Sequence, residues 1–221
     1  MSGSASSPDQ MLPAVAAYDE RAADYDAWYD DNPALYQAEL DLVAGLLEPL
    51  RALGAGLEIG AGTGRFAEPL GIDTGLEPSP RMAEYARERG VHIVQGLAED
   101  LPFADGRFGY TAFLTSLCFV ADAARALAEA RRVTTPGGGI VVAFLNRDSD
   151  LGAQLHATKA DDPFYATARF FTPEELAREL RAAGYVPEAW RQLSPTSASG
   201  VPAIYDGADE RLYCGVRAVR T

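Results

Sequence analysis

Residues 57–66 read Leu57-Glu58-Ile59-Gly60-Ala61-Gly62-Thr63-Gly64-Arg65-Phe66. The first three residues predict a short strand, and the glycines that follow predict a sharp turn into a helix. Glycine lets the backbone adopt conformations that other residues avoid, and it lets a ligand approach the chain closely. Because many nucleotide sites share a glycine-rich loop, the loop alone does not identify its ligand.

Three residues around this loop narrow the choice of ligand. Arg65 stands where the dinucleotide pattern G-x-G-x-x-G has its third glycine. Glu58 would oppose a pyrophosphate by on the order of 1 kcal/mol or more at short range, and it would favour an ammonium or a sulfonium. Glu77 ends the next expected strand, where an acidic residue can accept hydrogen bonds from ribose hydroxyls. A cationic nucleoside without phosphate fits both carboxylates. Arg65 and Glu58 disfavour a nucleotide-dependent oxidoreductase.

Strand and helix patterns alternate along most of the chain, which implies βαβ units and a mostly parallel sheet. The last two expected strands have no helix between them, so they can pair antiparallel at one edge. The predicted fold is an α/β, Rossmann-like three-layer sandwich. It has a seven-stranded, mostly parallel sheet with an antiparallel edge strand, and an N-terminal helical cap. We expect strands at 57–59, 74–77, 91–95, 108–114, 140–145, 186–193 and 212–219, a turn at 136–139, helices at 80–89, 122–132 and 172–184, and a helical stretch at 14–53 broken near residue 33.

Two helix starts carry capping signals. Ser79 precedes Pro80, which predicts that Ser79 caps a helix whose first residue is Pro80. Thr172 precedes Pro173, and Glu175 follows Thr172 by three residues, which predicts a capping box.

The length of 221 residues suits one domain with a sizeable core. We expect a disordered tail at 1–12 and a single ligand-binding domain at 13–221. Within that domain, residues 13–53 form the helical cap. Residues 146–170 are longer than an ordinary connection, and long loops of this kind are often functional, so we expect them to form an insert over the active site.

The net charge of −13 disfavours nucleic acid and anionic membranes as partners, because such a field repels them. No apolar run approaches the length of a membrane span, and the N-terminus lacks the pattern of a secretory signal. Two cysteines far apart in the sequence, Cys118 and Cys214, indicate neither a disulfide framework nor a zinc site. We therefore expect a cytoplasmic enzyme without a metal.

The glycine stretch resembles the E-x-G-x-G-x-G motif of class I S-adenosylmethionine-dependent methyltransferases. The group it resembles within that class is the small-molecule, methyltransferase type 11-like one. The resemblance covers about residues 15 to 218. It continues in Tyr18–Trp28, Gly75–Ser79, Gln95–Phe103, Leu127–Gly138, Phe171–Leu176 and Ala183–Tyr185.

The resemblance implies that the protein binds S-adenosylmethionine and releases S-adenosylhomocysteine. Leu97 replaces the Asp that is common in the adenine loop, so Glu99 would have to make any side-chain bond to the adenine amino group. Gly109 replaces an Asp that is usually structural. The residues implied to contact the cofactor are Tyr18, Tyr25, Glu58, Gly60, Ala61, Gly62, Gly64, Glu77, Pro78, Met82, Ala98, Glu99 and Thr115.

A small-molecule acceptor would lie beside the cofactor, where the aromatic N-terminal region can form a lid. His156 is a candidate general base, although a surface histidine on a helical insert is the alternative. Cys118 is not expected to be a nucleophile, because no histidine is near it in sequence and an apolar setting disfavours a thiolate. The candidate acceptor-binding residues are Trp28, Tyr29, Phe119, Asn146, Tyr165 and Arg169.

The expected reaction is methyl transfer to an oxygen or nitrogen of that acceptor by in-line displacement. The leaving thioether is neutral, so the enzyme mainly aligns the reactants and excludes water. Two alternatives stay open at this point. One is an enzyme that uses S-adenosylmethionine otherwise, such as a cyclase or decarboxylase. The other is a non-catalytic binding module on the same fold.

Overall fold

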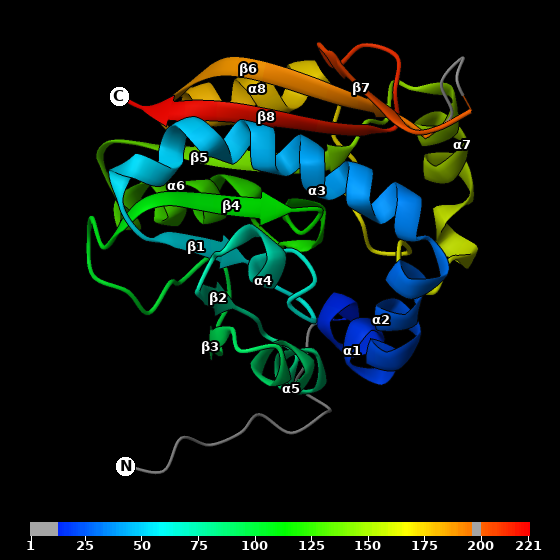
Figure 1. Cartoon of the computed structure of the whole chain (residues 1–221), viewed down its shortest axis with the longest axis horizontal. Coiled ribbons are helices and arrows are strands. Elements are labelled where there is room, and N and C mark those ends of the chain that lie inside the picture. The colour runs from blue at the N-terminus through cyan, green and yellow to red at the C-terminus, as the bar shows by residue number, and fades with distance from the viewer. Residues whose placement is uncertain (1–12, 196–199) are drawn as a thin grey trace.

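The computed structural model describes residues 13–195 and 200–221, so the predicted disordered tail lies outside the described residues. Its strands form one eight-stranded sheet in the order β3-β2-β1-β4-β5-β8-β6-β7 (Figure 1). The pairs from β3 to β5 are parallel, and the pairs β5-β8, β8-β6 and β6-β7 are antiparallel. The strands are β1 (Gly56–Ile59), β2 (Thr74–Leu76), β3 (His92–Val94), β4 (Phe108–Leu114), β5 (Thr134–Leu145), β6 (Tyr185–Ser194), β7 (Ala203–Asp206) and β8 (Tyr213–Arg220).

The sheet has one strand more than the seven predicted. The additional strand is β7, which pairs with β6 along four residues and forms the outer edge. Its four residues are exposed or half-buried, so they lack the buried apolar run that is typical of the central strands. The predicted antiparallel pairing of the last two long strands is confirmed, with β8 inserted between β5 and β6.

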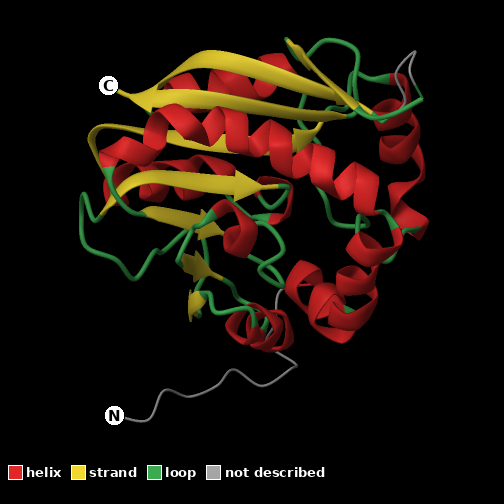
Figure 2. Cartoon of the chain, viewed as in Figure 1, coloured by secondary structure: helices red, strands yellow, loops and turns green. Residues whose placement is uncertain are grey.

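Helices cover both faces of the sheet and make a three-layer sandwich (Figure 2). Helices α3, α4 and α5 share one apolar cluster with the sheet, and α6 and α8 share the other. Alternate residues of β5 enter opposite clusters, with Val141 on the α3 side and Val142 on the α6 side. The helices of the two layers are α3 (Pro33–Leu47), α4 (Ala67–Leu70), α5 (Pro80–Glu88), α6 (Ala123–Val133) and α8 (Pro173–Ala182).

Short helices surround the end of the sheet at which β1, β2 and β4 finish. The predicted helical stretch at 14–53 consists of separate helices, and the predicted break is confirmed because Pro33 is the first residue of α3. In the part of the chain that the structure describes, no helix is long and apolar enough to cross a bilayer. The remaining helices are α1 (Pro13–Glu20), α2 (Ala22–Asp31), α7 (Asp150–Thr158) and the 3₁₀ helices η2 (Glu48–Leu53), η3 (Leu117–Phe119) and η4 (Lys159–Asp161).

Both predicted caps are confirmed. Ser79 Oγ accepts a hydrogen bond from the Met82 N–H at 3.1 Å, at the start of α5. Thr172 and Glu175 exchange two hydrogen bonds of 3.1 Å, which completes the capping box of α8.

The start of β5 differs from the expected turn. The strand begins at Thr134, six residues before the predicted start, and its register with β4 shifts between Phe108 and Tyr110. A Cβ on Gly138 would lie 2.4 Å from the carbonyl oxygen of Gly109, so the two backbones touch at this point. These glycines therefore allow an irregular strand pairing rather than ending the strand.

Candidate functional site

A cavity of about 550 Å³ lies at the carboxyl ends of β1, β2 and β4. Its size is within the range of small-molecule sites, and its place at the end of the parallel strands is where α/β sheets bind ligands. Residues of α1, α2 and α3 and of the segment 151–165 complete its walls. The cavity therefore has one wall from the sheet and another from elements outside it.

The glycine loop, residues 60–64, forms part of the sheet wall. Gly60, Gly62 and Gly64 have φ values of 77°, 56° and 81°, in the left-handed region that favours glycine. A Cβ on Gly60 would lie 2.5 Å from the Cβ of Ser116, so that position has no room for a side chain. Ser116 Oγ donates to the Ile59 carbonyl oxygen at 2.5 Å, which joins the ends of β1 and β4 beside the loop.

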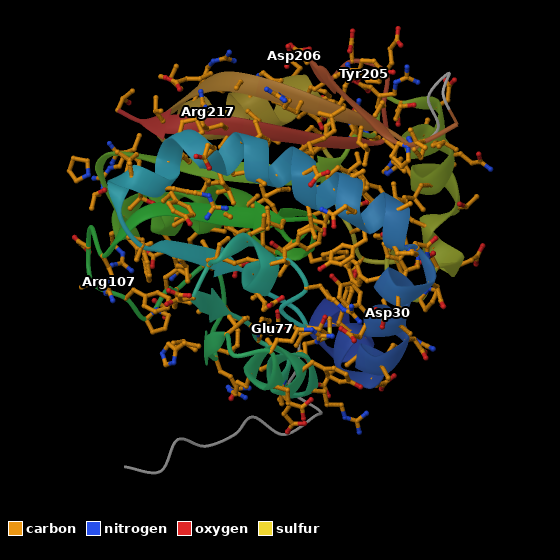
Figure 3. The ribbon with its side chains drawn as sticks, viewed as in Figure 1. Asp30, Glu77, Arg107, Tyr205, Asp206 and Arg217 are labelled. Atoms are coloured by element: carbon orange, nitrogen blue, oxygen red, sulfur yellow. The ribbon has the colours of Figure 1, made fainter. Side chains whose placement is uncertain are left out.

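Glu77 links the second strand to the glycine loop. Its Oε2 accepts a hydrogen bond from the Gly62 N–H at 2.8 Å, and its Oε1 accepts one from the Ser79 N–H at 2.9 Å. Figure 3 labels this residue just after β2. Burial raises the pKa of Glu77 to about 7, although the two backbone hydrogen bonds lower it. The carboxylate thus lines the cavity already oriented, with lone pairs left for a ligand hydroxyl.

Glu58 is buried in β1, two residues before the loop, and its Oε2 has no hydrogen-bond partner among the described residues. Burial and the charge of Glu77 raise the pKa of Glu58 well above its usual range. An unpartnered buried carboxyl is costly, and a cationic or hydrogen-bond-donating ligand group nearby would reduce that cost.

Arg65, the residue that departs from the dinucleotide pattern, fastens α2 to the glycine loop. Its guanidinium forms two hydrogen bonds with Asp26, at 3.0 and 2.8 Å, and two with Asp30, at 2.8 and 2.7 Å. Arg89 reaches the same Asp26 carboxylate at 2.9 Å. Figure 3 labels Asp30 on α2. Neither the role of Arg65 nor that of Asp26 was predicted from the sequence.

An aromatic wall, made of Tyr18, Tyr25, Phe119, Phe164 and Tyr165, faces the interior of the cavity. The Tyr18 ring lies 5.0 Å from the Phe119 ring and 5.2 Å from the Phe164 ring, measured between centroids. Tyr25 contacts Tyr18 edge-on at 5.5 Å. Three separate segments of the chain therefore converge in this wall.

Most residues predicted to bind the cofactor or acceptor line this one cavity. Glu58, Ala61 and Gly64 belong to the strand and loop beside it without lining it. The predicted residues that line it are Tyr18, Tyr25, Trp28, Tyr29, Gly60, Gly62, Glu77, Pro78, Met82, Ala98, Glu99, Thr115, Phe119 and Tyr165.

The structure places three predicted residues elsewhere. His156 is exposed on α7, where its ring packs against Phe170. Asn146 is buried at the end of β5 and donates to the Ala208 carbonyl oxygen at 3.3 Å. Arg169 forms an ion pair with Glu179 on α8, at 3.2 Å. None of the three lines the cavity.

The side chain of Glu99 is held by backbone hydrogen bonds. Its Oε1 accepts hydrogen bonds from the N–H groups of Ala121 and Asp122, at 2.7 and 3.1 Å. Leu97, which replaces the usual Asp of the adenine loop, lines the cavity with 43% of its surface exposed. This part of the cavity therefore presents an apolar side chain and an acidic side chain that is tied to the start of α6.

Sequence reasoning missed the cavity residues Glu39 and Tyr213, whereas Asp162 and Phe164 lie in the predicted insert 146–170 but were not predicted as binding residues. Glu39 did have a signal, because it lies at helical spacing from Val43 and Leu46 on the apolar face of α3. An acidic residue on an apolar face is unusual and deserves a functional explanation. Tyr213 had no comparable signal, since a tyrosine within a strand is ordinary.

No group of residues suited to a metal ion occurs in the described ranges 13–195 and 200–221. Cys118 and Cys214 are both free and buried. Burial raises the pKa of the Cys118 thiol to about 12, so this thiol stays protonated at neutral pH and is a poor nucleophile.

Comparison with known proteins agrees with this geometry. The family described as "Methyltransferase domain" matches residues 57–142, which run from β1 into β5. The crystal structure of an S-adenosylmethionine-dependent methyltransferase from Thermotoga maritima, described as a possible histamine N-methyltransferase, is 38% identical. The match has a TM-score of 0.85 and covers 93% of this chain and 99% of that one. The chain belongs to the class I S-adenosylmethionine-dependent methyltransferases.

Two relatives of uncharacterised function extend this comparison. A protein of Methanocaldococcus jannaschii is 36% identical over 168 residues, which are 76% of this methyltransferase and 80% of the relative. A protein of Mycobacterium tuberculosis is 41% identical over 182 residues, 80% of this chain. The methyltransferase spans only 63% of the length of that mycobacterial relative.

Proposed function

We propose that this methyltransferase transfers the methyl group of S-adenosylmethionine to a nitrogen or oxygen of a small-molecule acceptor. The observation that carries the proposal is the composition of the single cavity described above. Its sheet wall is built from the glycine loop and Glu77, and its opposite side from the aromatic wall. A nucleoside and an apolar acceptor can therefore lie next to each other in it.

The sheet wall fits S-adenosylmethionine. Glu77 is held by two backbone N–H groups and can accept hydrogen bonds from ribose hydroxyls. Met82 is buried at the start of α5 and offers an apolar surface to a flat ring. The Oε2 atom of Glu58 has no partner among the described residues, and a negative charge at this position would suit the positively charged cofactor. Tyr18 and Tyr25 would close over the methionine end.

Bound S-adenosylmethionine would supply an electrophilic methyl group on a positively charged sulfur. The protein would contribute alignment and the exclusion of water, which for an in-line displacement account for most of the catalysis. The aromatic wall provides both, because it is apolar and is assembled from α1, α2, η3 and the segment 162–165. We infer that the helical cap at 13–53 and the insert at 146–170 act as lids.

Other properties follow from the same proposal. The net charge of −13 and the absence of basic residues among the described residues that line the cavity disfavour nucleic acid as the acceptor. We propose a cytoplasmic location and no membrane partner. His156 is not proposed as the general base, because its side chain lies outside the cavity.

The test has two stages. In the first, thermal melts compare S-adenosylmethionine with NAD. At about 100 times its dissociation constant a ligand adds roughly 2.7 kcal/mol, which for a chain of this length shifts the melting temperature by roughly 5–10 °C. We expect a shift with S-adenosylmethionine alone, and no shift at saturating concentration would rule out the cofactor.

The second stage uses methyl-labelled S-adenosylmethionine and a panel of small amines, phenols and alcohols. Formation of S-adenosylhomocysteine together with a labelled acceptor supports methyl transfer. If the cofactor binds and a rearranged or decarboxylated product forms without S-adenosylhomocysteine, the alternative of another S-adenosylmethionine-using enzyme is correct. Binding without turnover across an acceptor panel would support a non-catalytic module.

A further inference from the structure

Glu39 is a buried acidic residue that the cofactor-binding role does not explain. It lies on α3, lines the cavity and has only 9% of its surface exposed. None of the described residues donates a hydrogen bond to its carboxyl group or forms an ion pair with it. Charged side chains are almost never buried to this degree unless they are paired, so the group is expected to have a partner that is not part of the chain.

Three tyrosines that line the cavity interact electrostatically with Glu39. Its charge acts on Tyr29 of α2, on Tyr165 of the aromatic wall and on Tyr213 of β8. The hydroxyl of Tyr213 is buried and also lacks a hydrogen-bond partner among the described residues. Two unpartnered polar side chains from different elements thus occur together in an otherwise aromatic environment.

The other acidic residues of the cavity differ from Glu39. Glu77, Glu99 and Asp162 each accept hydrogen bonds from two backbone N–H groups. Asp24 is exposed. Among the described residues that line the cavity there is no lysine, arginine or histidine. Glu39 is therefore the acidic residue of the cavity that combines deep burial with the lack of a protein partner.

We propose that Glu39 binds the protonated nitrogen of the acceptor, which makes the acceptor a small amine with an apolar or aromatic body. The inference rests on the proposed function, because it assumes that the space beside the cofactor holds an acceptor. An ammonium pairs with a buried carboxylate, and its hydrogens also suit the Tyr213 hydroxyl oxygen. Tyr29 and Tyr165 line the same cavity, where an aromatic ring can add cation–π attraction to a bound ammonium.

Binding of an amine at this position has a protonation signature. Burial raises the pKa of Glu39 to about 8, so the free carboxyl carries a proton at pH 7 in most molecules. The titratable groups that face it, Tyr29, Tyr165 and Tyr213, all have pKa values above the usual tyrosine value and stay neutral. An ammonium would favour the charged carboxylate, so amine binding at pH 7 releases the proton that Glu39 held.

The experiment is calorimetric titration of the protein saturated with S-adenosylhomocysteine, with phenethylamine and 2-phenylethanol as probes. These two molecules share a body and differ in the charged nitrogen. We expect phenethylamine to bind at least tenfold tighter than 2-phenylethanol. Repeated at pH 7 in buffers of different ionisation enthalpy, the amine titration should report the release of most of one proton, because pH 7 lies below the raised pKa of Glu39.

Three variants separate a binding role from a structural one. In Glu39→Gln the preference for the amine and the proton release should both disappear. In Glu39→Asp, which keeps the charge on a shorter side chain, part of the preference should return. Asp41→Asn, an exposed change on the same helix, is the matched control and should behave as wild type. The melting temperature of each variant shows whether it folds.

The outcomes distinguish this inference from the proposed function. If wild type binds S-adenosylhomocysteine but prefers neither probe, or if Glu39→Gln keeps the preference, the amine site is wrong and the methyltransferase proposal stands. If Glu39→Gln weakens S-adenosylhomocysteine tenfold, Glu39 belongs to the cofactor site and the inference is overturned. If wild type does not bind S-adenosylhomocysteine at all, the proposed function fails and this inference fails with it.

Discussion

The Oε2 atom of Glu77 lies 2.8 Å from the backbone nitrogen of Gly62 and accepts its hydrogen bond. The strand that would hold the ribose is thereby joined to the loop that would hold the methionine part. The same carboxylate accepts the Ser79 N–H at 2.9 Å, so one side chain connects the end of β2, the glycine loop and the start of α5.

Replacement of Glu77 by alanine should weaken S-adenosylmethionine binding at least tenfold. The ribose hydroxyls would lose their proposed acceptor, and the Gly62 and Ser79 N–H groups, which hold the loop in place through Glu77, would lose theirs; a lost partner of this kind costs about 1–3 kcal/mol. Glu77→Gln keeps an acceptor oxygen for one N–H and should lose less. Calorimetric titration with S-adenosylmethionine measures both, and Glu84→Ala, an exposed change on α5, is the control. Equal affinity in Glu77→Ala and wild type would contradict the assignment.

Gly60→Ala and Gly90→Ala form a matched pair. Both glycines have positive φ, 77° and 87°, so alanine meets a similar conformational cost of about 1–2 kcal/mol at each. A Cβ at Gly60 would also lie 2.5 Å from the Ser116 Cβ, whereas at Gly90 nothing lies within 4 Å. We expect Gly60→Ala to be the more destabilised in urea unfolding and to lose cofactor affinity. If the two variants unfold alike, the loop accommodates a side chain and its tight geometry is not required.

The cluster around Asp26 should contribute measurably to stability. The Asp26 side chain is 11% exposed and pairs with both Arg65 and Arg89. Asp26→Ala should lower the free energy of unfolding by about 2–3 kcal/mol, somewhat less than a fully buried pair because Arg65 keeps Asp30. Asp30→Ala, at a carboxylate whose side chain is 69% exposed, should lower the free energy of unfolding much less than Asp26→Ala does, because solvent screens the pair. Equilibrium urea unfolding checks both, and equal losses would mean that burial of Asp26 has no energetic consequence.

The buried carboxyls should make the ligand-free protein less stable as pH rises from about 5 to 8. Burial raises the pKa of Glu77 to about 7 and that of Glu39 to about 8, from an ordinary value of 4.5. The folded state then binds protons more tightly than the unfolded state within this window, and stability is lost as pH passes through the raised values. The hydrogen bond from Arg132 lowers the pKa of Glu129. Its contribution to stability is therefore lost as pH falls, at pH values below this window.

Urea unfolding at pH 5, 6, 7 and 8 measures this slope. Glu39→Gln should flatten the slope, chiefly between pH 5 and 8, and should be no less stable than wild type at pH 8. A slope that is unchanged in Glu39→Gln would show that this carboxyl does not titrate with a raised pKa.

Much of the fold followed from local signals. The two capping patterns at Ser79 and Thr172 are physically self-contained, since each needs only a side chain and a nearby N–H, and both are present. The apolar strands 108–114 and 140–145 were recognised because helices cover both faces of the sheet. The edge strand β7 was not recognised, because four half-exposed residues owe their conformation to pairing with β6 rather than to their own pattern.

The site was harder to predict wherever distant segments meet. The glycines and Glu77 could be predicted from the sequence, because each one constrains the backbone or ends a strand. Arg65 was noted only as a departure from the dinucleotide pattern. Its structural role was not predicted, because its partners lie 35 and 39 residues away in the sequence, on α2. His156 attracted attention as a titratable residue, but its orientation on α7 is set by packing against Phe170. Where distant segments of the chain meet, the direction of a side chain depends on tertiary packing.

The two walls of the cavity draw on different parts of the chain. The glycine loop and Glu77 belong to the sheet, whereas Tyr18, Phe164 and Tyr165 belong to peripheral segments that pair with no strand of it. Exchanging residues 151–165 therefore leaves the ladder of β1, β2 and β4 intact. Acceptor choice in this architecture can be redesigned, and can diverge between descendants of one ancestor, without rebuilding the part of the molecule that holds the methyl donor.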